Sequence, residues 1–435
     1  MDRSEATHSL SWYIYRFSIS KNALFSWGVA LLLGMIVAGY PLVSNLPGFL
    51  NVESRIISVP FRAFVLLLSI ALIISRVICK RHIYLGVLWF PLLVFWSFYF
   101  IRILLDTVLF PIPLRLDISE YYLFSIGVCF IPMVALMAWF DNDTQRKSFN
   151  LTVIIAAISS VLALYSVYLD YISGDTYNSV EVGRMALKTL NPISMGHLGV
   201  SLAILCVFYF VSKRTTSLIN ALLFALMLVL GVFVALAGAS RGPILALVIV
   251  LLYYFFHSLK KKISLKSLLF APLFFFLLYK FATIIQANIG FNCIARFQHF
   301  MNSNAGVPSV RMVLYEDAWS QFIHNPVFGS ALEELNSGFY PHNLIIESFM
   351  STGLVGGIAF CTILILGLWS AVTIMRLRPS YGWVSLLFFQ YVIGAQFSGS
   401  LYQCGTMWAL LGAVIGLSIP LRLSERSDII LLTNL

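Results

Sequence analysis

Long apolar segments alternate with short polar segments along the whole chain. A helix needs about 20 consecutive apolar residues to cross the roughly 30 Å hydrocarbon core of a bilayer. Because backbone polar groups must be paired within lipid, the pattern predicts an all-α polytopic membrane protein with about 12 transmembrane helices, built as a single membrane domain over residues 1–435. The predicted helices lie near 23–43, 61–79, 83–104, 121–140, 149–170, 193–211, 218–239, 242–257, 268–286, 343–375, 383–399 and 406–421.

One of these boundaries is marked by a short polar break. A continuous helix over 218–257 would be about 60 Å long at 1.5 Å per residue, which is enough for two crossings. The segment "GASRGP" at 238–243 supplies the break, and Pro243 suits the first turn of the second helix. Arg241 is therefore expected between two helices, at the membrane boundary.

Composition excludes several classes of protein. The 435 residues are 60% hydrophobic and only 11% charged, which is not the balance of a soluble domain. The net charge of +10 comes from basic residues in short loops between apolar segments, so no nucleic-acid partner is predicted. The six cysteines have no metal-ligand spacing, and no HExxH or outward DxD motif is present. The sequence accordingly predicts no metal and no other cofactor.

The distribution of Lys and Arg predicts the orientation. With the N-terminus placed inside, eighteen of the 28 basic residues fall in inside segments and eight in outside segments, while Arg62 and Lys280 lie within apolar segments. This asymmetry follows the positive-inside rule and predicts that both termini are cytoplasmic. Seven of the eight outside basic residues are arginine, whose planar fork suits phosphate or carboxylate.

Two predicted outer loops are longer than turns. The smaller one covers 171–192, and the larger one covers 287–342. The larger loop contains an amphipathic helix at 311–323, where Met312, Tyr315, Trp319 and Phe322 recur at helical spacing. We expect this stripe to pack against the membrane face.

Three outward arginines are candidates for anion binding. Arg241 lies amid Gly, Ala and Ser, which leave space for a ligand or for close helix packing. Arg311 opens the amphipathic helix, and Arg184 precedes the helix that starts near Asn191. Each arginine alone is equally consistent with an interfacial or solvated side chain.

The segment "YPHNLIIE" (340–347) is the most unusual polar stretch. Here Pro341 and His342 stand at the predicted start of a helix that re-enters the membrane. Helix N-termini present free N–H groups that favour anions. A histidine at an interface is often structural, but its place near outward arginines favours a functional role. Neighbouring candidates for substrate binding are Tyr340, Asn343 and Glu347, the last two on one helix face.

Taken together, these segments resemble the bacterial O-antigen ligase and O-antigen polymerase superfamily, over roughly 184 to 375. The resemblance rests on "SRG" at 240–242, on "RMVLYEDAWSQFIHNPVFG" at 311–329, and on "PHNLIIESFMSTGLVGG" at 341–357. The last segment contains the histidine, ten intervening residues and Gly353. "RMALKTLNPISMG" at 184–196 resembles the arginine loop of the polymerases, with eleven rather than ten residues before Gly196.

The resemblance implies a glycosyltransferase that is metal-independent and inverting. It implies transfer of a glycan from undecaprenyl diphosphate to a sugar hydroxyl at the periplasmic face of the bacterial inner membrane. Arg241 and Arg311 match the arginines that bind the diphosphate, and His342 matches the catalytic histidine; Arg184 is a further candidate for substrate binding. Fixed guanidinium groups suit a developing diphosphate charge, and histidine suits proton transfer at neutral pH.

The acceptor distinguishes the members of the superfamily. A polymerase uses a lipid-linked repeat unit as acceptor, whereas a ligase uses lipid A–core. Only 31 residues separate Arg311 from His342, which together with the Arg184 segment favours a polymerase. Its expected partners are the undecaprenyl-diphosphate-linked donor and acceptor, membrane lipid and a chain-length regulator protein. A lipid-linked oligosaccharide flippase or another transporter is the alternative from a different class.

Overall fold

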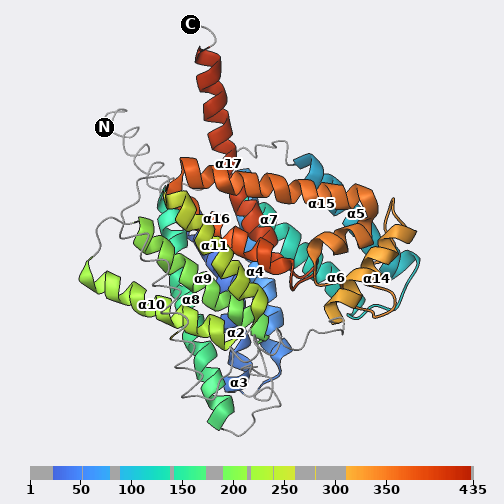
Figure 1. Ribbon diagram of the computed structural model, residues 1–435, viewed down its shortest axis with the longest axis horizontal. Helices are drawn as coiled ribbons and strands as arrows, with labels where there is room; N and C mark the ends of the chain where they lie inside the picture. Colours follow the sequence, from blue (N-terminus) through green and yellow to red (C-terminus); the bar gives the residue numbers. More distant parts are fainter. Residues whose placement is uncertain are drawn as a thin grey trace, which may run out of the picture.

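The computed structural model describes residues 23–50, 52–78, 89–137, 142–172, 190–212, 217–238, 240–259, 280 and 310–432 (Figure 1). Within these residues the regular structure is helical, apart from one isolated β-bridge between Glu334 and Phe339. The predicted all-α polytopic fold is therefore confirmed.

Nine helical segments in the described part of the chain are long and apolar enough to cross a membrane. They are Ala23–Ser44, which includes η1 (Met35–Gly39) and α2 (Tyr40–Ser44); α4 (Ser54–Ile78); α5 (Trp89–Leu104) with η2 (Leu105–Leu109); α6 (Ile118–Tyr122) with η3 (Leu123–Phe130) and α7 (Ile131–Leu136); α8 (Asn142–Ile172); α9 (Pro192–Ser212); α10 (Leu218–Ala237); α11 (Arg241–Leu259); and α15 (Leu344–Leu377). The remaining helices are α3 (Leu46–Leu50), α14 (Val310–His324), η4 (Pro379–Tyr381), α16 (Gly382–Ala395) and α17 (Gly405–Leu432).

The predicted helices and the observed ones agree closely in position. The break at 238–240 separates α10 from α11, and Pro243 lies in the first turn of α11, as the sequence predicts. The predicted segments 383–399 and 406–421 correspond to α16 and to the first part of α17, which are shorter than a full span. Apart from residue 280, the predicted helix at 268–286 lies outside the described residues, so the count of twelve stays a prediction.

Helix α9 forms the interior of one half of the protein. Figure 1 shows it among α8, α10 and α11, and it is buried around most of its circumference. Small residues allow the close approach of α9 and α10, since a Cβ atom on Gly199 would lie 2.8 Å from the Cα of Ala235. Membrane helices use such small residues because van der Waals packing, rather than hydrophobic burial, drives their association.

Helix α15 bends at a single glycine. Gly353 has φ 65° and ψ −161°, which divides α15 into a short first part and a long second part. The loop after α14 enters this bend, where Leu354 N–H donates to Pro326 O (2.7 Å) and Ser330 N–H donates to Met350 O (3.0 Å). The bend therefore fixes the segment that leads back to the start of α15.

Helix α14 packs on α15 through one of its faces. Its buried residues are Leu314, Ala318 and Phe322, four residues apart, whereas Met312 and Trp319 of the predicted stripe are about half exposed. The ring of Phe322 contacts that of Phe349 on α15, at a centroid distance of 5.3 Å. Packing of the predicted stripe against the membrane face stays a prediction.

Candidate functional site

His342 lies in the turn that immediately precedes α15. It has φ 57°, a left-handed conformation that few residues other than glycine adopt. Such uncommon backbone conformations cluster at functional sites, where the surrounding structure holds them in place. The N-cap of α15 is Asn343, so the histidine precedes the helix rather than lying in its first turn as predicted.

The imidazole of His342 has two unequal nitrogens. Nδ1 is buried and has no hydrogen-bond partner among the described residues, which leaves Nε2 as the nitrogen that can meet a substrate. The ring stands edge-on to the ring of Tyr340, at a centroid distance of 4.6 Å. Tyr340 therefore fixes one side of the imidazole.

Positive charge surrounds the histidine. Burial, followed by the guanidinium groups of Arg311 and Arg115, lowers the pKa of His342 to about 4. Arg311 also interacts electrostatically with Arg241 at the start of α11. The fold thus brings Arg241, Arg311 and His342, which are distant in sequence, to one end of the helix bundle. Such a group of charges suits an anionic ligand.

Arg115 is one of the eight basic residues predicted to lie in outside segments, but no role was predicted for it. Its backbone N–H donates to Glu333 Oε2 (2.9 Å), and its Nη2 donates to the hydroxyl of Tyr402 (3.3 Å). The guanidinium carbon lies 5.4 Å from the ring centroid of Tyr340. The excess of arginine among outside basic residues was the only sequence signal that included it.

A buried carboxylate anchors this arginine. Glu333 is 2% exposed and accepts hydrogen bonds from the hydroxyls of Tyr121 (2.6 Å) and Tyr402 (3.3 Å). These bonds satisfy the carboxylate in a place where an unpaired charge would be costly. Glu333 therefore joins the 110–117 segment to the loop that carries His342.

A second arginine clamps the bend of α15. Arg102 donates to the backbone carbonyls of Phe328, Gly329, Ser330 and Ser351 and to the carboxylate of Asp106. Asp106 in turn accepts from Leu332 N–H (2.7 Å). All these partners belong to the protein itself, so Arg102 supports the site and does not face a ligand.

The other candidate residues in the described chain make structural contacts. Asn343 Oδ1 accepts from the N–H groups of Ile345 and Ile346, and its Nδ2 donates to Gln396 O (3.3 Å). Glu347 is wholly buried, and its Oε1 accepts from Leu401 N–H (3.0 Å). Both residues hold the loop between α16 and α17 against the start of α15. Their role as substrate contacts stays a prediction.

Two further predictions concern Arg184 and a metal site. Arg184 lies outside the described residues. In the part of the chain that the structure describes, no three His, Cys, Asp or Glu side chains are grouped as a metal site would require.

The comparison with known families bears directly on this site. Residues 226–361 match the family model Wzy_C, described as O-antigen ligase. The matched region is about a third of the chain and supports the resemblance to the O-antigen ligase and polymerase superfamily. The matched region includes Arg241, Arg311 and His342, whereas Arg115 precedes it. No curated protein matches the chain. The superfamily supports a glycosyltransferase of the O-antigen ligase or polymerase type in a multi-pass membrane protein.

Proposed function

We propose that this protein is an O-antigen polymerase-type glycosyltransferase. It transfers a glycan from undecaprenyl diphosphate to a sugar hydroxyl of a lipid-linked repeat unit, at the periplasmic face of the bacterial inner membrane. The observation that carries the proposal is the convergence of Arg241, Arg311 and His342 at one end of the bundle.

In the proposed reaction the two arginines bind the diphosphate of the donor. His342 Nε2 takes the proton of the acceptor hydroxyl while the hydroxyl oxygen attacks the anomeric carbon from the face opposite the diphosphate. The bond between that carbon and the phosphate oxygen breaks, and its electron pair leaves on undecaprenyl diphosphate. The guanidinium groups stabilise the charge that develops on this leaving group. Attack from the opposite face inverts the anomeric configuration.

The low pKa of His342 agrees with a base that is neutral before the reaction. A proton acceptor must be unprotonated at neutral pH and lie within hydrogen-bond reach of its hydroxyl. The Tyr340 ring and the left-handed backbone hold the imidazole in place before any substrate binds. We expect the His342→Ala variant to insert normally and to lose transfer by at least about 100-fold, as general acid–base catalysis typically contributes about 10²–10⁴-fold.

The activity test uses purified protein and lipid-linked repeat units, without vesicles. Elongation by the wild type and its loss in His342→Ala would support the proposal, and a fully active variant would remove His342 from the chemistry. Transport across a membrane cannot produce elongation in this assay, so the result also separates the enzyme from a flippase.

The second candidate is an O-antigen ligase, since the matched family model carries that description. A ligase would transfer the finished glycan to lipid A–core. The lipopolysaccharide ladder of a deletion strain distinguishes the two. Loss of a polymerase leaves lipopolysaccharide with a single repeat unit, whereas loss of a ligase leaves lipopolysaccharide without any.

A further inference from the structure

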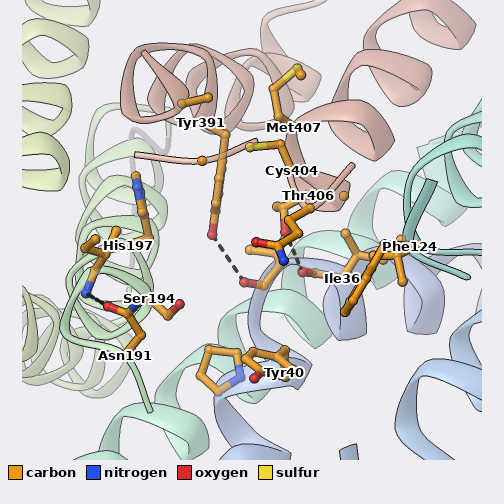
Figure 2. A pocket seen from close by; sticks show the side chains of 18 of the residues that line it. Ile36, Tyr40, Phe124, Asn191, Ser194, His197, Tyr391, Cys404, Thr406 and Met407 are labelled. Carbon is orange, nitrogen blue, oxygen red and sulfur yellow. Dashed lines mark hydrogen bonds between the residues drawn. The ribbon is translucent and has the colours of Figure 1, made fainter. Parts of the chain in front are cut away.

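A cavity of about 430 Å³ lies beside the His342 site (Figure 2). Its walls come from the Ala23–Ser44 segment, α4, η3, the start of α9 and the loop between α16 and α17. Small-molecule sites typically have volumes of about 300–1,000 Å³ and combine apolar walls with a few polar groups. The cavity therefore has the size of a binding site.

Hydroxyl, amide and aromatic side chains are distributed around this cavity. Figure 2 shows Asn191 and Ser194 on one side, with Tyr391, Thr406 and Phe124 around the rest. Among the described residues, the side chains of Ser194, Ser398 and Gln403 in the lining have no hydrogen-bond partner. Polar groups without a partner in a partly enclosed site favour a ligand that can donate and accept hydrogen bonds.

Among the described residues that line the cavity, Arg62 is the one charged side chain and none is a carboxylate. Its guanidinium carbon lies 4.6 Å from the ring centroid of Phe124 and 5.9 Å from that of Tyr40. No carboxylate in the described part of the chain forms an ion pair with it. An ionisable residue inside a membrane span is costly and marks a substrate path more often than not. Its planar N–H donors suit oxygen atoms of a ligand.

The cavity adjoins the proposed base. Tyr340 belongs to its lining and also stands against the ring of His342. The loop between α16 and α17 forms another part of the wall and is bonded to the start of α15 through Asn343 and Glu347. Arg241 and Arg311, the proposed diphosphate ligands, are not part of the lining. The cavity thus lies next to the base but apart from the donor's diphosphate.

Resting on the function proposed above, we propose that this cavity binds sugar residues of the acceptor repeat unit. Sugar rings present hydroxyl groups at their rim and C–H groups on their faces, which match the amide, hydroxyl and aromatic groups of the lining. An isoprenoid chain has no hydrogen-bonding group, so it would leave Ser194, Ser398 and Gln403 unsatisfied and Arg62 without oxygen partners. The cavity holds the acceptor so that its hydroxyl meets His342.

Binding of two separate probes to the purified full-length protein tests the proposal. One probe is the repeat-unit oligosaccharide, released from its lipid carrier by mild acid, and the other is undecaprenyl phosphate. The variants are Arg62→Gln and Gln403→Leu. Their matched controls are Arg55→Gln, on the same helix and outside the lining, and Gln145→Leu, which contacts Ser380 O (2.8 Å).

We expect Arg62→Gln and Gln403→Leu each to weaken oligosaccharide binding about tenfold or more, because each removes hydrogen bonds to the sugar. The controls should bind like the wild type, and undecaprenyl phosphate should bind all variants equally. Weaker binding of undecaprenyl phosphate in the cavity variants, unchanged oligosaccharide binding in both, or no oligosaccharide binding by the wild type would overturn the assignment.

The proposed function can be disproved without disproving the sugar-binding site. His342→Ala should retain oligosaccharide binding while losing transfer. A wild-type protein that binds the oligosaccharide as expected but never elongates a lipid-linked repeat unit would disprove the enzyme and leave the sugar site in place.

Discussion

Replacing Gly353 with alanine should damage the site through the backbone alone. Its φ of 65° and ψ of −161° lie in a region essentially confined to glycine, at a cost of about 1–3 kcal/mol for a residue with a Cβ atom. A Cβ atom here would also lie 2.6 Å from Gly329 N and still closer to the carbonyl of Val327. Because real Cβ atoms do not approach so closely, the loop after α14 must move away from the bend of α15.

This movement removes specific hydrogen bonds. Two hydrogen bonds cross the contact that the new methyl group would occupy. Leu354 N–H donates to Pro326 O, and Ser330 N–H donates to Met350 O. Each lost backbone bond costs about 1 kcal/mol. With the backbone conformation included, Gly353→Ala should lower the free energy of unfolding by about 3–5 kcal/mol. Transfer activity should fall as well, since the displaced loop leads to His342.

Gly338→Ala is a matched control for this prediction. Gly338 has nearly the same φ, 66°, but a Cβ atom there would meet nothing within 4 Å. The Gly338→Ala substitution should therefore cost only the unfavourable backbone conformation, about 1–2 kcal/mol. Reversible unfolding in detergent, followed by tryptophan fluorescence, measures both variants. Equal destabilisation by the two substitutions would refute the reasoning, because steric contact with the loop would then contribute nothing.

Three other predictions follow. Because the pKa of His342 is lowered to about 4, the histidine is neutral above that pH. The value of kcat/KM for transfer should therefore fall only as the pH drops toward about 4. An acid limb near the usual histidine pKa of about 6.5 would contradict this. Arg102→Met should destabilise the protein by about 3–5 kcal/mol, since it leaves Asp106 buried without its ion-pair partner, and a loss below about 1 kcal/mol in unfolding measurements would contradict this. EDTA should leave the rate of elongation unchanged, and restoration of a lost rate by Mg²⁺ would argue against a metal-independent reaction.

The helical architecture could be predicted because it depends on hydropathy, which is local in sequence. The break before Arg241 was visible as a polar interruption with a proline at a suitable position. The bend at Gly353 was not predicted, although the glycine was noted as part of a motif. Its φ depends on the loop that enters the bend, and such a tertiary contact leaves no periodic pattern.

The candidate site was predictable in its residues but not in its supporting contacts. Arg241, Arg311 and His342 stand out because charged side chains are rare in this chain. Arg115 and Glu333 were missed because their contact joins segments more than 200 residues apart in sequence. Glu347 stood out for the same reason as His342, yet its carboxylate is buried against Leu401 N–H, a partner that no local spacing indicates.

In the proposed reaction the donor should bind before proton transfer, because the arginines act on the pKa of His342. Arg311 and Arg115 favour the neutral form of His342, and part of its lowered pKa comes from their charge. A donor diphosphate bound to Arg241 and Arg311 would offset that charge with at least two negative charges of its own. The pKa of His342 would then rise toward the working pH of the enzyme, and a general base is most effective when its pKa lies near that pH. The acid limb of kcat, which reports the complex, should therefore lie at a higher pH than that of kcat/KM, which reports the free enzyme. Identical limbs would show that the donor's charge does not act on His342, and the diphosphate would then have to bind away from Arg311.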